Sequence, residues 1–215
     1  MIRRIQFKSK EEWLDARKGI GGSDASAIIG RNPYKTNQDL WREKTGRTEP
    51  EDISDKPYVK YGNDAEPLIR GLFALDYPEY KVEYFDNNMI INDRLPFAHA
   101  SLDGELTDPD GRKGILEIKT SNILQSMQRE SWKDKIPDNY YVQVLHYLMV
   151  TEYDFVVLTA QLKTVFGGDL RKQTRHYFIE REDVLDDLAF LEKEEREFWQ
   201  SVINDEEPGL ILPVF

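Results

Sequence analysis

The strongest constraint on the fold is a change of hydrophobic period along the chain. Residues 80–119 hold short runs of alternating apolar and polar side chains, separated by turn signals such as Asp108-Pro109-Asp110-Gly111, and this alternation is typical of β-strands. Before and after this block, the apolar residues recur at helical spacing. Helices on both sides of a strand-rich centre must bury their apolar faces against it. The pattern predicts an α/β or α+β layered domain with a central mixed sheet flanked by helices.

We expect helices over residues 9–18, 24–29, 36–46, 63–77, 140–150 and 183–203, and strands over residues 80–85, 89–92, 98–105, 114–119, 155–162 and 175–180. Ser23 is expected to cap the second helix. A chain of 215 residues has room for one sizeable core. We therefore expect a single domain over residues 1–215.

The composition limits the kind of metal site. The chain has no cysteine, which excludes disulfides, iron–sulfur clusters and thiolate zinc sites. Hard cations held by carboxylates fit best. The amino terminus lacks the apolar core of a secretory signal, and no window is long enough to span a membrane. We expect a cytoplasmic protein without a membrane partner.

A formal net charge of −11 disfavours nucleic-acid binding at first sight. However, residues 180–207 contain twelve acidic and three basic residues, so most of the excess lies in one segment. Phosphate contacts can then come from basic side chains elsewhere, namely Arg3, Arg4, Arg17, Lys18, Lys133, Lys135, Arg171 and Lys172.

The candidate catalytic centre lies in the strand over residues 114–119. Side chains alternate along a strand, so Glu117 and Lys119 leave the same face. Asp103 lies near the end of the preceding expected strand, and a hairpin between the two strands would place its carboxylate beside Glu117. The sequence therefore predicts two carboxylates facing one lysine.

Hydrolysis of a phosphodiester requires such a group. Two carboxylates, helped by the carbonyl oxygen of Ile118, bind Mg²⁺, which polarises the phosphate and lowers the pKa of a bound water. The lysine holds that water or helps to deprotonate it. We expect two ions, with Mn²⁺ as an alternative to Mg²⁺. By themselves these residues are equally explained by a salt bridge on a solvated strand.

Four other residues have a functional and a purely structural explanation. Arg17 and Ser23 flank a glycine-rich turn before a helix, where free N–H groups favour an anion such as a terminal phosphate, although Ser23 also fits a simple helix cap. Glu66 follows Asn63 at capping-box spacing, but it is also a candidate metal or water ligand. Gln143 is either a buried amide or a group that reaches the phosphate or its metal. We expect His146 to pack rather than to bind metal.

A series of motifs in one order resembles the YqaJ-type viral recombinase family, to which phage lambda exonuclease belongs. These are Arg17, GIGGSDASAIIG at residues 19–30, NPY at 32–34, LWREKTG at 40–46, GNDAE at 62–66, ASLDG at 100–104, LEIKT at 116–120, and the spacing of Pro137, Tyr140, Gln143 and His146-Tyr147. The resemblance covers about residues 9–150.

The resemblance implies a restriction-endonuclease-like core that digests linear duplex DNA from 5′ ends in the 5′-to-3′ direction and leaves a 3′ single-stranded tail. It implies metal ligation by Asp103, Glu117 and the Ile118 carbonyl, and a catalytic role for Lys119. Arg17 and Ser23 match the 5′-phosphate pocket, and Glu66 and Gln143 match accessory active-site residues. It also implies a ring-shaped homotrimer, a single-strand annealing protein as partner, and a phage or prophage origin.

Three alternatives remain at this point. A dimeric restriction-type endonuclease would share the same core and cut internally. A Cas4-like nuclease is similar in its catalytic strand, but the chain lacks the cysteines that such an enzyme needs for its cluster. A catalytically idle adaptor that binds DNA ends would keep the fold, although the presence of Asp103, Glu117 and Lys119 argues against it.

Overall fold

The computed structural model describes residues 1–123 and 130–213. Its helices are α1 (Lys10–Ala16), α2 (Gly22–Ile28), α3 (Asn37–Lys44), α4 (Pro57–Asp76), α6 (Asp138–Thr151), the 3₁₀ helix η1 (Arg181–Val184) and α7 (Leu185–Asn204). Its strands are β1 (Ile2–Gln6), β2 (Lys81–Glu83), β3 (Asn88–Asn92), β4 (Leu95–Ala100), β5 (Gly104–Thr107), β6 (Lys113–Ile123), β7 (Phe155–Phe166) and β8 (Asp169–Glu180).

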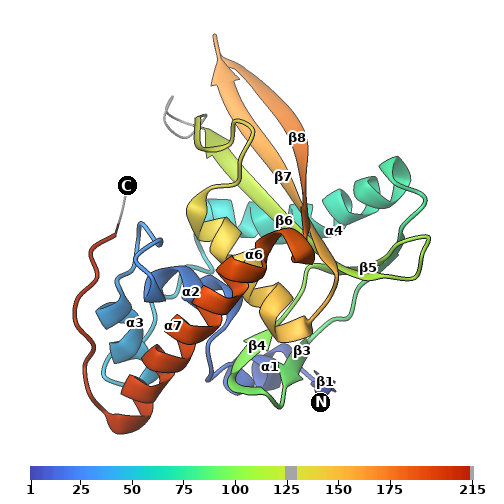
Figure 1. The fold of residues 1–215 in the computed structure, drawn as a ribbon. Helices are drawn as coiled ribbons and strands as arrows, with labels where there is room; N and C mark the ends of the chain where they lie inside the picture. The colour runs from blue at the N-terminus through green and yellow to red at the C-terminus, as the bar shows by residue number, and fades with distance from the viewer. Residues whose placement is uncertain (124–129, 214–215) are drawn as a thin grey trace.

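The strands form two sheets (Figure 1). The larger has the order β2-β5-β6-β7-β8, in which β6 and β7 are parallel and the other pairs are antiparallel. The smaller is antiparallel with the order β1-β3-β4. The predicted mixed central sheet with flanking helices is confirmed.

The two faces of the larger sheet pack on different helices. From β6, Leu116 and Ile118 belong to a core with Ile69 and Phe73 of α4. Ile115, on the other face, belongs to a larger core that includes residues of α2, α6 and α7. Because side chains alternate along β6, Glu117 leaves on the α6 side.

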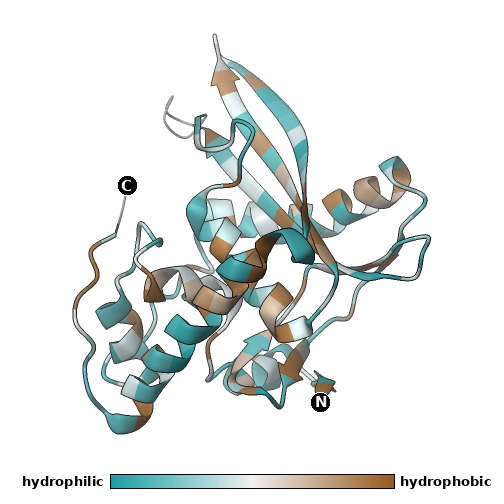
Figure 2. Ribbon diagram, in the orientation of Figure 1, coloured by the Kyte–Doolittle hydropathy of each residue, from teal (hydrophilic) through white to brown (hydrophobic). Residues whose placement is uncertain are grey.

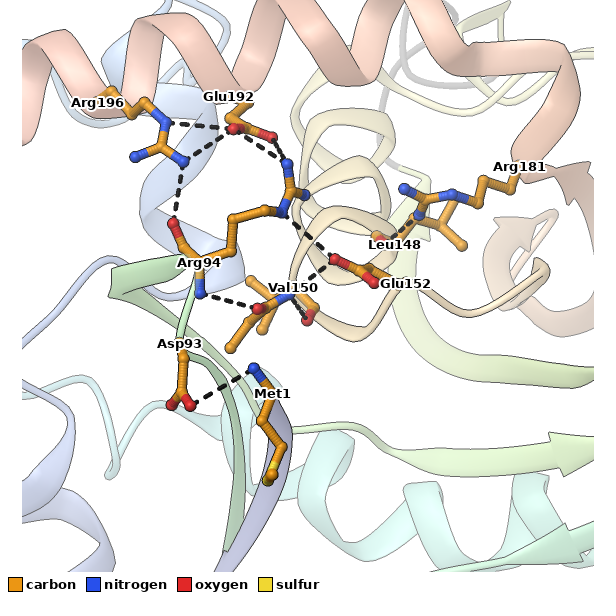
Figure 3. A network of polar contacts seen from close by, with 10 residues as sticks. Met1, Asp93, Arg94, Leu148, Val150, Glu152, Arg181, Glu192 and Arg196 are labelled. Atoms are coloured by element: carbon orange, nitrogen blue, oxygen red, sulfur yellow. Dashed lines mark hydrogen bonds and ion pairs between the residues drawn. The ribbon is translucent and has the colours of Figure 1, made fainter.

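A polar network fastens the carboxyl end of α6 to the β3–β4 turn and to α7 (Figure 3). Arg94 forms ion pairs with Glu192 at 3.0 Å and with Glu152 at 3.4 Å. Arg196 donates to the carbonyl of Arg94 at 3.0 Å and to Glu192 at 2.9 Å. Part of the acidic surface of α7 is thereby neutralised within the fold.

Several predicted boundaries were wrong. The strand expected over residues 98–105 is two strands in different sheets, because β4 ends at Ala100 and β5 begins at Gly104. α4 begins at Pro57 rather than near Asn63, since proline at the first helical position already has a helical φ and needs no N–H partner. The prediction also missed β1.

The hairpin of β7 and β8 is longer than predicted. The two strands are paired from Phe155↔Glu180 to Phe166↔Asp169. Gly167 and Gly168 join them with φ values of +59° and +89°. A two-residue hairpin turn with both φ angles positive favours glycine at both positions and matches the twist of the strands.

Within the described part of the chain, no helix combines the length and apolar character needed to cross a membrane.

Candidate active site

Strand pairing brings Asp103 and Glu117 together. Gly104, the first residue of β5, lies opposite Leu116 of β6, so the residues on either side of this pair, Asp103 and Glu117, are neighbours. The Asp103 carboxylate accepts a hydrogen bond from the backbone N–H of Ile118 at 2.8 Å. The two acids predicted to share a site therefore do so.

Glu117 is the centre of the polar contacts. One carboxylate oxygen, Oε1, lies 2.7 Å from Nζ of Lys119 and accepts a hydrogen bond from the Gln143 amide at 2.9 Å. The same amide nitrogen donates to the Tyr147 hydroxyl at 2.9 Å. Glu117 is 1% exposed, and α6 thus supplies the groups that fix its orientation.

Glu66 approaches the same site from α4. Its carboxylate accepts from Arg70, one helical turn further along, at 3.0 Å. The Arg70 guanidinium lies 3.6 Å from the centroid of the Tyr84 ring. A cavity of about 560 Å³ is lined by Glu66, Arg70, Tyr84 and Asp103.

Burial raises the pKa of all three carboxyl groups, and the charge of Asp103 adds to it at Glu117 and Glu66. Burial, and then the charge of Asp103, raises the pKa of Glu117 to about 8. The same two causes raise the pKa of Glu66 to about 7, and burial raises the pKa of Asp103. Negative charge at this site is thus unfavourable unless a cation compensates it.

Lys119 supplies part of that compensation. Burial lowers the pKa of Lys119, but the charges of Glu117 and Asp103 outweigh burial and leave the pKa above its usual value. The lysine is therefore protonated at neutral pH and acts as a hydrogen-bond donor.

The residues present fit a divalent cation. The second carboxylate oxygen of Glu117, Oε2, is buried without a hydrogen-bond partner, which is unfavourable unless a ligand satisfies it. In residues 1–123 and 130–213, no group of three or more His, Cys, Asp or Glu side chains is arranged to hold a metal. A cation held by Asp103 and Glu117 would therefore complete its shell with backbone oxygen, water or phosphate.

Arg17 lines the same cavity as Asp103 and Glu66. Its guanidinium lies 4.6 Å from the centroid of the Trp13 ring. Ser23 is exposed in the first turn of α2 and is not the helix cap, which corrects the prediction. Gly21 is the capping residue, and its N–H donates to the Asp24 carboxylate at 3.0 Å.

The glycine before Ser23 has a packing role. A Cβ on Gly22 would lie 2.5 Å from the Tyr147 ring and 3.0 Å from the Gln143 side chain. α2 can therefore lie directly against the part of α6 that holds Glu117.

The sequence-based prediction missed Arg70, Tyr84 and Trp13. Arg70 follows Glu66 at a spacing of four residues, and Trp13 precedes Arg17 at the same spacing, so each pair lies on one helix face. That spacing was the available signal, whereas nothing in the sequence placed Tyr84 beside Arg70.

His146, expected to pack, is fully buried. Its Nδ1 lies 2.7 Å from Glu195 of α7, and its Nε2 lies 2.9 Å from the carbonyl of His99. It joins α6 to α7 and to β4.

Comparisons with known proteins identify the family and the fold. Residues 12–154 match the YqaJ-like viral recombinase domain family. The uncharacterized protein YqaJ of Bacillus subtilis (strain 168) is 35% identical over 205 residues, which cover 94% of this chain and 59% of that protein. The chain therefore spans about three fifths of the length of this relative.

Two solved structures share the fold. An alkaline exonuclease from Laribacter hongkongensis has a TM-score of 0.69 and 20% identity over 91% of this chain and 94% of its own. A phage related exonuclease from Haemophilus somnus 129PT has a TM-score of 0.58 and 15% identity over 87% of this chain and 96% of its own. The predicted restriction-endonuclease-like fold is thereby confirmed.

Proposed function

Since the chain belongs to the YqaJ-like viral recombinase domain family, we propose that it is a nuclease that degrades linear duplex DNA from 5′ ends in the 5′-to-3′ direction. It leaves 3′ single-stranded tails for recombination. The observation that carries this proposal is the convergence of Asp103, Glu117 and Lys119, with Asp103 lining the cavity and a carboxylate oxygen of Glu117 buried and unpaired.

Asp103 and Glu117, with the Ile118 carbonyl, are the proposed ligands of Mg²⁺, for which Mn²⁺ can substitute, and we include a second ion in the proposal. When bound, the cation neutralises charge on the phosphate and makes water a better nucleophile at neutral pH. Its positive charge would also keep Asp103 and Glu117 ionised, although burial raises the pKa of both groups.

The remaining residues orient the reacting groups. Lys119, held by Glu117 at 2.7 Å, donates a hydrogen bond to the attacking water or to a phosphate oxygen. Gln143 fixes the Glu117 carboxylate from α6. Glu66 is the proposed acceptor of a proton from water: it lines the cavity together with Asp103, and its pKa of about 7 suits proton transfer near neutral pH.

Arg17 and Ser23 are the proposed ligands of the 5′-phosphate. The support is that Arg17 lines the cavity that Asp103 and Glu66 also line, so a bound terminal phosphate would lie within reach of the hydrolytic centre. A guanidinium can donate two parallel hydrogen bonds to a phosphate, which would favour phosphorylated ends.

The other expectations stay proposals. They are a homotrimeric ring that encloses DNA, a single-strand annealing protein as partner, a cytoplasmic location in a bacterial host, and one nuclease domain over residues 1–215.

Cleavage assays test the proposal against its alternatives. The purified chain is incubated in Mg²⁺ with a 5′-phosphorylated linear duplex, a duplex labelled at its 3′ ends, and a covalently closed circle. We expect mononucleotides from linear DNA, retention of the 3′ label on long strands at early times, an intact circle, and no reaction in EDTA. A linearised circle would indicate an endonuclease, and binding of ends without any cleavage would indicate an idle adaptor.

A further inference from the structure

The outer half of the β7–β8 hairpin, residues 161–175, forms an arm that projects beyond the helices (Figure 1). The Gly167-Gly168 turn closes its tip with positive φ angles. β8 is the edge strand of the sheet, and all of its residues from Asp169 to Thr174 are exposed. β7 is also paired with β6 as far as Thr164, so the base of the arm is three-stranded and only its tip, residues 165–170, is a two-stranded ribbon. The outer strand, β8, is open to solvent along residues 169–174.

The arm is cationic in a strongly acidic chain. It contains Lys163, Arg171, Lys172 and Arg175 against a single acid, Asp169. Figure 2 shows hydrophilic residues along the outer half of β8. The local charge is opposite in sign to that of the chain as a whole, which carries −11, so an anionic partner is attracted to the arm and repelled by much of the remaining surface.

The two lysines of the arm lie where their positive charges repel each other. Lys163 and Lys172 are directly opposite one another across the β7–β8 ladder, and like charges in this position are destabilising. Their ammonium groups lie 3.3 Å and 5.7 Å from the centroid of the Tyr61 ring. Neither lysine has a carboxylate at ion-pair distance among the residues that the structure describes.

Protection of the sheet edge does not explain this pair. Lysines on an edge strand prevent pairing with another chain, and Lys172 on β8 alone would serve that purpose. Lys163 lies on β7, which has β6 on one side and β8 on the other. The two charges are accounted for if a polyanion binds across both strands.

The tip adds an apolar contact surface. Val165 and Leu170 form a cross-strand pair, with 65% and 58% of their surface exposed. The two-stranded tip fits the major groove of duplex DNA, which is about 12 Å wide. With the tip in the groove, Val165 and Leu170 would meet base edges or methyl groups, and Lys163 and Lys172 at the base of the tip would meet the phosphates.

We propose that the arm is a second DNA-binding surface, in which Lys163 and Lys172 contact phosphates of the duplex and Val165 and Leu170 lie in its groove. The proposal rests on the proposed function, because it takes duplex DNA as the partner. Lys119 is in register with Ala160 on β7, so Lys163 lies three residues further along and on the opposite face. At roughly 3.3 Å per residue the offset along the strand is about 10 Å.

Salt-dependent binding tests the arm. The affinity of the full chain for a fluorescent 30-bp duplex is measured by anisotropy in EDTA at several salt concentrations. The Lys163→Gln/Lys172→Gln double variant is compared with Lys81→Gln/Lys193→Gln, a control with the same change of net charge. Both control lysines are well exposed, with 67% and 65% of the side chain accessible, and pair with neighbouring glutamates away from the arm.

Each phosphate contact contributes about 0.9 to the slope of log affinity against log salt. The arm variant should therefore lose about 1.8 of the parent's slope. Equivalently, between 50 and 200 mM salt the parent should lose about 12-fold more affinity than the arm variant. The control should keep the parental slope. An unchanged slope in the arm variant, an equal change in the control, or no binding by the parent would overturn the proposal.

A second variant, Val165→Ser/Leu170→Ser, tests the tip. We expect weaker binding with the parental salt slope and an unchanged mass by light scattering. If these substitutions instead reduce the mass of the protein assembly in solution and leave DNA affinity unchanged, the tip is a contact between copies of the chain and the proposal fails. Cleavage by the parent in Mg²⁺ is measured separately. Binding through the arm without cleavage would overturn the proposed nuclease activity but would still support DNA binding by the arm.

Discussion

Replacing Glu117 with glutamine should stabilise the protein in the absence of divalent cations and abolish cleavage. The folded state raises the pKa of Glu117 from 4.5 to about 8. Between these two values the folded chain keeps a proton that the unfolded chain releases. The free energy of unfolding contributed by Glu117 therefore falls as the pH rises through this window.

The structure sets the size of the effect. A pKa that changes from 4.5 to about 8 corresponds to on the order of 4 to 5 kcal/mol once both states are ionised, to on the order of 3 kcal/mol at pH 7, and to less than about 1 kcal/mol at pH 5. For a chain of this length, 1 kcal/mol shifts the melting temperature by about 2–4 °C. Glutamine cannot ionise, and it keeps an oxygen to accept from Lys119 and Gln143.

Scanning calorimetry in EDTA at pH 5, 7 and 8 measures the difference between the parent and Glu117→Gln. We expect a melting temperature for the variant that exceeds the parent's by about 10 °C at pH 8 and by little at pH 5. Added Mg²⁺ should raise the melting temperature of the parent only. The control is Glu197→Gln on α7, where the side chain is 63% exposed. A gap that does not change with pH, or a parent more stable than the variant at pH 8, would refute the reasoning.

Three other substitutions test the roles of Lys119, of Arg17 and of the buried pair between Glu195 and His146. Lys119→Ala should reduce cleavage by about 100-fold or more and leave duplex affinity within a few-fold of the parent; turnover near the parental rate would remove the lysine from the mechanism. Arg17→Ala should reduce the preference for 5′-phosphorylated over 5′-hydroxyl ends by about tenfold or more, as expected for a lost charged hydrogen bond; an unaltered preference would place the phosphate elsewhere. Glu195→Leu should destabilise the fold by about 3–5 kcal/mol in urea titrations, because it breaks the fully buried pair with His146; a loss below about 1 kcal/mol would contradict that pairing.

The strand of the candidate active site, β6, was predictable because its information is local. Alternation along residues 114–119 places Glu117 and Lys119 on one face whatever the rest of the chain does. The position of Asp103 required a second assumption, the pairing of β5 with β6, and the structure contains that pairing. The class of fold followed from the order of helical and alternating segments.

The boundaries that failed depend on tertiary contacts. Apolar and polar residues alternate without a break from Ala98 to Leu102. Only the pairing of β4 with β3 and of β5 with β6 reveals that the chain leaves one sheet and enters another. The first turns of α4 are rich in tyrosine and valine, which favour strands, and the packing of Tyr61 near β7 overrides that preference.

The parts of the site that were missed join residues distant in the chain. Tyr84 meets Arg70 only because the segment after β2 crosses α4. The long hairpin was partly visible in Gly167-Gly168, but the polar outer half of β8 conceals its strand character, because both of its faces are exposed.

Anomalous diffraction from crystals soaked in Mn²⁺ would show whether Asp103 and Glu117 hold a divalent cation beside Lys119. We predict a peak about 2.0–2.3 Å from carboxylate oxygens of both residues, including the buried Oε2 of Glu117. The peak should be absent from a Glu117→Gln crystal soaked in the same way. If Mn²⁺ density in the parent lies only at other positions and neither carboxylate binds the ion, Asp103 and Glu117 are not the metal ligands.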